Sequence, residues 1–198
     1  MGFAIDYKRR LHTALDKISL EAVEDLIDVF RKARAEDRQI FVFGNGGSAA
    51  TANHFACDMV KGASFGRSQR FKILSLAEQI PTLTAYSNDV GYESVFVEHL
   101  KNFARPGDVV MGISGSGDSE NVIQAIDYGN SIGCFSVGLS GFNGGRLRPM
   151  VDLSVHVPDG HMGRVEDAHF VVCHMVCYHF MDTESGGNGT ADAPSLPA

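Results

Sequence analysis

The residues best suited to chemistry in this 198-residue chain are histidines and carboxylates in two helical segments. His54 and Asp58 are four positions apart, so they share one face of the helix predicted for Ser48–Lys61. An imidazole and a carboxylate at this spacing can ligate one metal ion, and either group can move a proton. An isolated pair of this kind is more often structural than a metal site. Its position one to two helical turns beyond a candidate ligand-binding turn, described below, favours a functional role.

A second group lies on the helix predicted for Arg164–Asp182. Glu166, His169 and His174 are on or near its apolar side, where ionisable groups need partners, and His179 follows them. A straight helix rises about 1.5 Å per residue, which separates Glu166 from His174 by about 12 Å. We therefore expect that these two side chains do not reach one ion from the same chain.

Two glycine-serine turns are candidates for binding an anion. The first turn, GNGGS at residues 44–48, follows an apolar run and precedes a helical pattern. The second, SGSGDS at residues 114–119, has the same setting and adds three hydroxyls. Such turns bring backbone N–H groups and a helix N-terminus to the carboxyl edge of a sheet, as phosphate binding requires.

The alternative is that these turns only make tight connections, with Ser48 and Ser119 as helix N-caps. For the first turn, the two interpretations are equally good. The second turn carries more hydroxyls than capping needs, which favours phosphate binding there. Neither turn matches GxxxxGK[ST] or GxGxxG, so a nucleotide-hydrolysing P-loop and a dinucleotide cofactor are disfavoured.

Apolar, β-prone runs alternate with helical patterns along the chain. The expected strands are Gln39–Phe43, Phe71–Leu76, Asp108–Ile113, Cys134–Leu139 and Leu153–Val157. The expected helices between and after them are Ser48–Lys61, Tyr92–Phe103, Ser119–Ser131 and Arg164–Asp182. Nearly continuous apolar strands alternating with helices predict an α/β fold with a doubly wound, five-stranded parallel sheet.

The two ends of the chain differ from this central unit. Residues 6–35 predict one helix with a regular apolar stripe, which consists of Leu11, Leu15, Ile18, Ala22, Leu26, Val29 and Ala33. The stripe can cover the sheet or form an oligomer contact. We therefore divide the chain into an N-terminal helical segment at 1–37, assigned as an oligomer contact, an α/β domain at 38–182 and a tail at 183–198. The tail lacks periodic apolar positions and is expected to be disordered.

Composition restricts the class of partner and the location. The 17 basic and 24 acidic residues give a formal charge of -7, which argues against nucleic-acid and membrane binding. No run approaches the roughly 18 apolar residues of a membrane span, so a cytoplasmic location is expected. Cys57, Cys134, Cys173 and Cys177 are expected to be buried, reduced thiols. Cys173 and Cys177 share a helix face, but without a second pair they are a weak metal site.

Three strings together carry a family resemblance: FGNGGSAATANHFACDM at 43–59, SNDVG at 87–91 and GISGSGDSENVIQA at 112–125. Over about residues 8–182 the chain resembles the phosphoheptose isomerases of the sugar isomerase (SIS) family. The resemblance implies a flavodoxin-like SIS fold and an enzyme that converts sedoheptulose 7-phosphate to D-glycero-D-manno-heptose 7-phosphate through an enediol. It also implies one zinc ion per site and a homotetramer with sites between subunits.

The resemblance further implies roles for individual residues. The implied substrate-binding residues are Asn45, Gly46, Gly47, Ser48, Asp89, Ser114, Gly115, Ser116, Ser119 and Glu166. Among them, the residues at 114, 115, 116 and 119 hold the phosphate, and those at 45, 48 and 89 contact the sugar chain. The implied zinc ligands are His54, Asp58, Glu166 and His174, with Asp58 as carbon base and His174 as its acid/base partner. The Asp89 segment also fits an ordinary turn.

Three residues depart from the pattern of the resembled family. Asp58 stands in place of a glutamate base, Glu166 in place of a glutamine, and Gly163 in place of an aspartate. These differences leave the reaction type in place and the substrate open. The alternatives are an isomerase or sensor for another sugar phosphate, and a non-catalytic SIS adaptor that binds the bacterial replication initiator protein. Such adaptors lack the counterparts of Asp58 and His174, so the enzyme is favoured.

Overall fold

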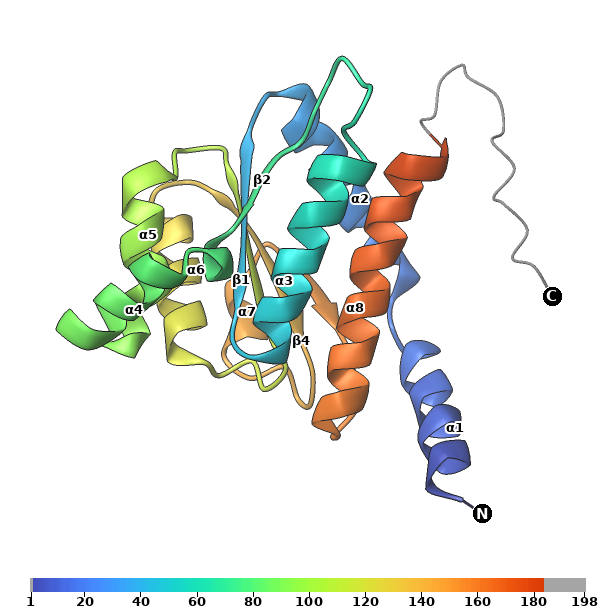
Figure 1. The fold of residues 1–198 in the computed structure, drawn as a ribbon. Coiled ribbons are helices and arrows are strands. Elements are labelled where there is room, and N and C mark those ends of the chain that lie inside the picture. Colours follow the sequence, from blue (N-terminus) through green and yellow to red (C-terminus); the bar gives the residue numbers. More distant parts are fainter. Residues whose placement is uncertain (1, 184–198) are drawn as a thin grey trace.

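The apolar runs of the sequence pair into one parallel sheet in the computed structural model, which describes residues 2–183 (Figure 1). The strands are β1 (Gln39–Gly44), β2 (Lys72–Ser75), β3 (Val109–Ser114), β4 (Phe135–Ser140) and β5 (Leu153–His156). They follow the order β2-β1-β3-β4-β5, with every neighbouring pair parallel. This confirms the predicted five-stranded, doubly wound α/β fold.

Helices cover both faces of the sheet (Figure 1). Their bounds are α1 (Phe3–Leu15), α2 (Leu20–Ala35), α3 (Gly47–Cys57), α4 (Ile80–Asp89), α5 (Val95–Phe103), α6 (Glu120–Ser131), α7 (Leu147–Met150) and α8 (Met162–Tyr178). On one face, α2, α3 and α8 share an apolar core with alternate strand residues such as Val42 and Met111. On the other face, α5, α6 and α7 pack against residues such as Phe41 and Val110. Alternation along each strand thus supplies both cores.

The strand register brings the two glycine-serine turns together. In the β1–β3 pair, Gly44 lies opposite Ile113, and in the β3–β4 pair, Ser114 lies opposite Ser140. The carboxyl ends of the three central strands are therefore level at one edge of the sheet. Ligands of open α/β sheets bind at this edge, at the point where the strand order reverses. Here that point is between β1 and β3.

The N-terminal segment forms two helices instead of the single predicted helix. The break occurs at residues 16–19, because the Ser19 hydroxyl accepts a hydrogen bond from the Ala22 amide (3.2 Å) and starts α2 as an N-cap. Helix α2 covers the sheet, with Leu26 and Phe30 fully buried. Helix α1 projects from the body of the molecule and contacts α8, where the Tyr7 hydroxyl donates to Asp167 (2.6 Å) (Figure 1).

Other parts of the chain also differ from expectation. Residues 80–89 form α4, which was not predicted, and none of these ten described residues is buried. Cys57 is exposed rather than buried. The three other thiols are buried as expected, and burial raises the pKa of Cys134 to about 11 and that of Cys173 to about 12.

Two further expectations concern the tail and the membrane. The predicted disordered tail lies, apart from Thr183, outside the described residues. Within residues 2–183, no helix is long and apolar enough to cross a membrane.

Candidate active site

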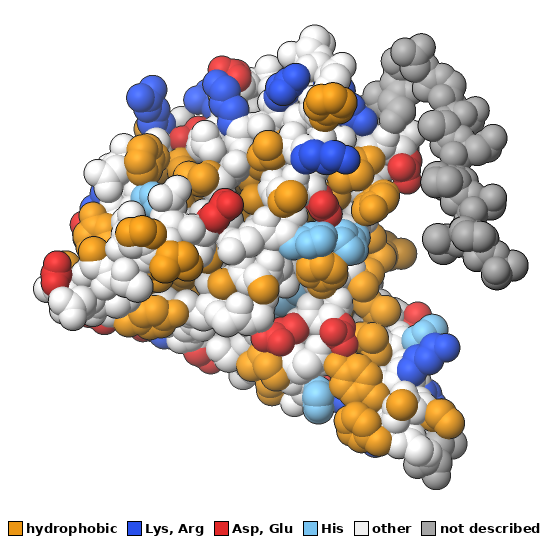
Figure 2. Space-filling model, viewed as in Figure 1, with side chains coloured by type: hydrophobic (Ala, Val, Ile, Leu, Met, Phe, Trp, Pro, Cys, Tyr) orange, Lys and Arg blue, Asp and Glu red, His pale blue; other side chains and the backbone are white. Residues whose placement is uncertain are grey.

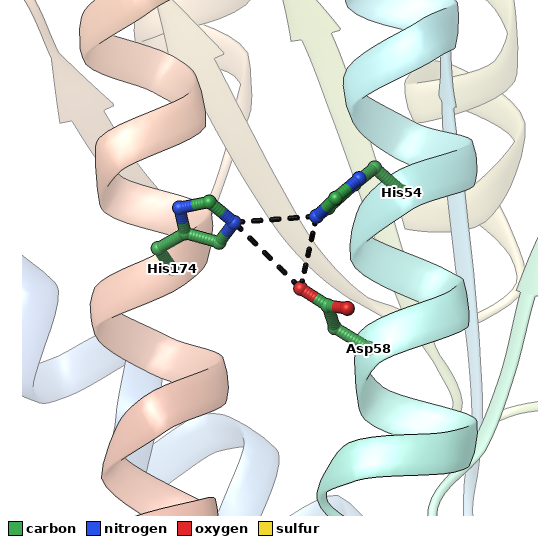
Figure 3. Close-up of side chains that lie close together, drawn as sticks. All are labelled: His54, Asp58 and His174. Carbon is green, nitrogen blue, oxygen red and sulfur yellow. Dashed lines mark hydrogen bonds and ion pairs between the residues drawn. The ribbon is translucent and has the colours of Figure 1, made fainter. Parts of the chain in front are cut away.

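Two parallel helices present the predicted chemical groups to each other. Helices α3 and α8 lie side by side on one face of the sheet, and both run away from its carboxyl edge (Figure 1). His54 and Asp58 project from the α3 segment and His174 projects from α8 toward them (Figure 3). The Nε2 atom of His54 lies 3.1 Å from Oδ2 of Asp58 and 3.3 Å from Nε2 of His174. His174 Nε2 lies 3.7 Å from the same Asp58 oxygen.

The ligand atoms of this triad, defined as His54, Asp58 and His174, lie close enough together to hold one metal ion. Ligand atoms about 2.0–2.2 Å from a tetrahedral zinc ion lie about 3.3–3.6 Å from one another. The three observed separations, 3.1, 3.3 and 3.7 Å, bracket this range. Two imidazoles and one carboxylate leave a fourth position open, which is the pattern of catalytic rather than structural zinc sites. The donor set therefore fits the metal.

Aromatic packing orients the two imidazoles without closing the site. The Phe170 ring lies 4.7 Å from the His54 ring and 4.5 Å from the His174 ring, measured between centroids. The side chain of Asp58 is 24% exposed, that of His174 37% and that of His54 48%. Histidine side chains gather at the surface over α3 and α8 in Figure 2. A substrate can therefore reach all three groups.

Glu166, the fourth predicted ligand, lies outside the triad. It is two helical turns nearer the start of α8 than His174, as the 12 Å argument requires. Its carboxylate packs against Gly47, where an added Cβ atom would lie 2.6 Å from Oε1 of Glu166. Glu166 of α8 thus lies against the first glycine-serine turn, which is consistent with its predicted role in substrate binding. One chain supplies three of the four predicted zinc ligands.

The first turn is held by a network that the sequence patterns did not reveal. Asn45 and Asn121 exchange two side-chain hydrogen bonds of 2.8 and 2.9 Å, and the Tyr92 hydroxyl donates to Asn45 Oδ1 (2.8 Å). Asn121 is buried near the start of α6, so this pair ties the first turn to the second. Gly46 has a positive φ of 54° at the position preceding α3, and Ser48 is buried one residue into that helix.

The second turn uses its hydroxyls differently from simple caps. Ser119 occupies the N-cap position of α6, but its hydroxyl lies 3.1 Å from that of Ser114. Ser114 Oγ also accepts from the Gly117 amide (3.1 Å), and Ser116 Oγ accepts from the Asp118 amide (3.2 Å). The turn thus gathers three hydroxyls, two of them linked to each other, at the N-terminus of α6. This arrangement favours the anion-binding interpretation over capping.

Charged and polar groups surround this cluster. Arg146 donates to the Asp118 carbonyl (3.0 Å) and to the Glu120 carboxylate (2.8 Å), which holds the pKa of Glu120 below its usual value. Asp89, predicted to contact the sugar chain with an ordinary turn as the alternative, is the last residue of α4. Its carboxylate is exposed and accepts from the Asn88 side chain (2.7 Å).

Comparison with known proteins agrees with this architecture. The SIS domain family matches residues 5–141. The chain is 34% identical to a phosphoheptose isomerase from Helicobacter hepaticus over 178 residues, which cover 88% of each protein. It is 42% identical to the phosphoheptose isomerase of Geobacter metallireducens over 141 residues, which cover 71% of this chain and 74% of that protein.

Solved structures give the same result. The phosphoheptose isomerase from Neisseria gonorrhoeae superposes with a TM-score of 0.82 at 29% identity, and the match covers 89% of this chain and 94% of that one. The one from Francisella tularensis superposes with a TM-score of 0.84 at 22% identity, covering 91% and 95%, and shares the fold. The chain therefore belongs to the phosphoheptose isomerase family of SIS-domain proteins.

Proposed function

We propose that the protein is an aldose–ketose isomerase that converts sedoheptulose 7-phosphate to D-glycero-D-manno-heptose 7-phosphate. The observation that carries the proposal is the triad, in which a carboxylate and two imidazoles lie within 3.7 Å of one another. Helix α3, which carries His54 and leads into Asp58, begins at the first glycine-serine turn, and the Asn45–Asn121 pair ties that turn to the second one. One extended sugar phosphate can therefore span from a phosphate site at the second turn to the triad. The relatives described above are named as isomerases, which supports the enzyme over an adaptor.

The reaction needs two proton transfers, and the triad supplies a group for each. Asp58 takes a proton from C1 of the ketose while His174 donates one to the C2 carbonyl oxygen, which gives the enediol. Asp58 then returns its proton to C2, and His174 accepts the proton from the C1 hydroxyl as the aldehyde forms. The Nε2 atom of His174 faces Asp58 across the space between α3 and α8, which supports a role as the acid/base partner of Asp58 (Figure 3).

His54, Asp58 and His174 would also hold a zinc ion. When bound, the ion supplies a positive charge that stabilises negative charge developing on the sugar oxygens. Glu166 and the two turns bind and orient the rest of the substrate, with the phosphate at Ser114, Gly115, Ser116 and Ser119. A carboxylate at Glu166 favours neutral hydroxyls over the phosphate near the first turn, because like charges repel.

A direct assay tests this proposal. Purified protein should convert sedoheptulose 7-phosphate to the aldoheptose phosphate in preference to five- and six-carbon ketose phosphates. Metal analysis of the same protein should show zinc at about one ion per chain. Turnover of only a shorter sugar phosphate would favour an isomerase with a different substrate, and no turnover of any of them would support a sensor or an adaptor.

Replacing Ser116 with Ala is expected to raise KM more than it lowers kcat. The phosphate is remote from the reacting carbons, so its contacts stabilise bound substrate and transition state almost equally. Losing one hydrogen bond to a charged group costs about 1.5–3 kcal/mol, or roughly a 10- to 150-fold rise in KM. Steady-state kinetics would measure it, with exposed Ser68→Ala as the control. An unchanged KM would place the phosphate elsewhere.

We further propose a cytoplasmic homotetramer with active sites near subunit interfaces. Phe3 and Ile5 on the projecting α1 are 80% and 62% exposed, and Ile80 at the start of α4 is 61% exposed. Apolar side chains gather on α1 in Figure 2. Exposed apolar helices of this kind are typical of interfaces. Sedimentation analysis should report four chains, and a stable, active monomer would contradict the proposal.

A further inference from the structure

Both helices that carry the triad end in a π-helical turn. The α3 segment continues as Asp58–Gly62, where the Ala63 amide donates to the carbonyl of Asp58 (3.0 Å), and α8 continues as His179–Thr183. Turns of this type are rare and frequently occur at functional sites. Asp58 is the first residue of one of them, so the position of its backbone depends on how that turn is held.

Arg67 joins these two helix ends. Its Nη1 atom donates to the carbonyl oxygens of Ala63 (2.9 Å) and Phe180 (2.5 Å), and its Nη2 atom donates to that of Met181 (3.2 Å). One guanidinium therefore bridges the end of the segment that carries Asp58 and the end of the segment that carries His174. All three of these hydrogen bonds are with backbone carbonyls of the two helix ends.

The chemistry of this position favours an arginine. The last carbonyls of a helix have no partner inside the helix, and they carry the negative end of its dipole. Because α3 and α8 are parallel, both negative ends lie at the same place (Figure 1). A planar cation with several donors satisfies carbonyls from two segments at once, whereas a lysine ammonium is a point charge without this fork.

The three hydrogen bonds of Arg67, called the clamp below, hold the C-terminal ends of α3 and α8 together. Other contacts hold the pair close to this end and at its N-terminal end. Next to Arg67, the end of the Met181 side chain packs directly on Gly62. At the opposite end, the Glu166 carboxylate packs against Gly47. The triad lies between these contacts, so the separation of His174 from Asp58 is set by how the two helices are held together.

We propose that Arg67 is a positioning residue of the active site, which holds α3 and α8 at the separation that the triad needs to bind a metal ion and transfer protons. The metal-binding part of this inference stands on the triad geometry alone. The kinetic part rests on the proposed isomerase function. Positioning groups around metal ligands typically contribute 10- to 100-fold in affinity or activity.

The test compares Arg67→Gln and Arg67→Lys with Arg70→Gln, which removes an exposed arginine of the same segment. Co²⁺ titration followed by visible absorption, and competition with Zn²⁺, give metal affinity per folded chain. Arg67→Gln should weaken both metals by about 10- to 100-fold and lower kcat for sedoheptulose 7-phosphate by a similar factor. KM should change little, because the proposed phosphate turn lies at the carboxyl edge of the sheet, where α3 begins, and Arg67 lies at the opposite end of that helix. Arg67→Lys should recover part of both losses, and Arg70→Gln should match the wild type.

Several outcomes would overturn the inference. A folded Arg67→Gln variant with wild-type metal affinity and kcat would do so, and so would a loss of thermal stability without change in either quantity. If Arg67→Gln does not fold, Arg67→Lys decides, because wild-type affinity and kcat in that variant contradict the clamp. A wild type that binds Co²⁺ but does not isomerise the heptulose phosphate refutes the proposed function only, and the metal titrations still test Arg67.

Discussion

Replacing Asp58 with Asn is expected to lower kcat for sedoheptulose 7-phosphate by about 10²- to 10⁴-fold, the range that a positioned general acid or base contributes. The amide has nearly the same shape as the carboxylate but cannot accept the carbon-bound proton. Asp58 also lies 3.1 Å from His54 and 3.7 Å from His174, so the change disturbs the candidate metal site as well. Stopped assays on metal-loaded protein would measure the loss, with exposed Asp25→Asn as the matched control.

The companion variants show whether the triad acts as one unit. His174→Ala should reduce kcat to a similar degree, and the double variant should be little worse than either single one, since residues that act together are not additive. Asp58→Glu restores the side chain that the resembled family uses, which is one methylene longer. Retained or increased turnover in that variant would mean that the site has the geometry of the family. Near-normal activity in Asp58→Asn would refute the assignment of Asp58 as the base.

Acid is expected to destabilise the protein by roughly 3 kcal/mol through one residue, His169. This residue is 1% exposed, and neither ring nitrogen has a side-chain hydrogen-bond partner among the described residues; the nearby Ser140 backbone offsets only part of the effect of burial on its pKa. Burial lowers its pKa to about 4 from an ordinary value near 6.5. The unfolded chain therefore binds a proton below about pH 6.5, while the folded chain stays neutral down to about pH 4. Above about pH 6.5, His169 is neutral in both states and does not reduce the free energy of unfolding. As the pH falls from about 6.5 toward 4, protonation of His169 in the unfolded chain lowers the free energy of unfolding.

Urea unfolding at two pH values measures this effect. Between pH 7.5 and pH 5 the His169 contribution should fall by about 2 kcal/mol, and the His169→Leu variant should lack this part of the change. His156, whose ring lies 3.3 Å from the Ser140 hydroxyl, also has a pKa lowered mainly by burial and titrates in the same direction. The difference between wild type and variant isolates His169. Equal pH dependence in both proteins would show that His169 has another partner in solution.

The sheet was predictable because each strand is a short apolar run with a turn at its end. Each predicted strand overlaps the observed one, with bounds that differ by at most one residue at either end, as for Phe71–Leu76 against Lys72–Ser75. Helix α4 is present in the structure but was not predicted, and it shows the limit of reasoning from periodicity. Periodicity detects a helix through the face it buries, and α4 buries none of its described residues. The N-terminal break was missed for a different reason, because the apolar spacing continues through the capping residue Ser19.

The candidate site was predictable to a similar extent. Spacing places His54 and Asp58 on one face, but it does not give the pairing of α3 with α8 that adds His174. The link between Asn45 and Asn121 depends on the β1–β3 register, which brings together residues 76 positions apart. Glu166 shows the opposite case, because helical rise alone separates it from His174 in any straight helix. Helical spacing and rise therefore predicted correctly which side chains of one helix lie together. They did not predict contacts between segments that are far apart in the sequence.

The late position of α8 in the chain has a consequence for synthesis. The core shared by α2, α3 and α8 needs Val172, Val176 and Phe180, all fully buried and close to the end of the described chain. Strand β1 also cannot complete its pairing until β3 has been synthesised, because Ile40 pairs with Val109. A nascent chain that has emerged only as far as residue 160 therefore presents one apolar face of its sheet without its final helix. Such a surface is one that chaperones bind and that promotes aggregation until α8 has emerged and packed on it.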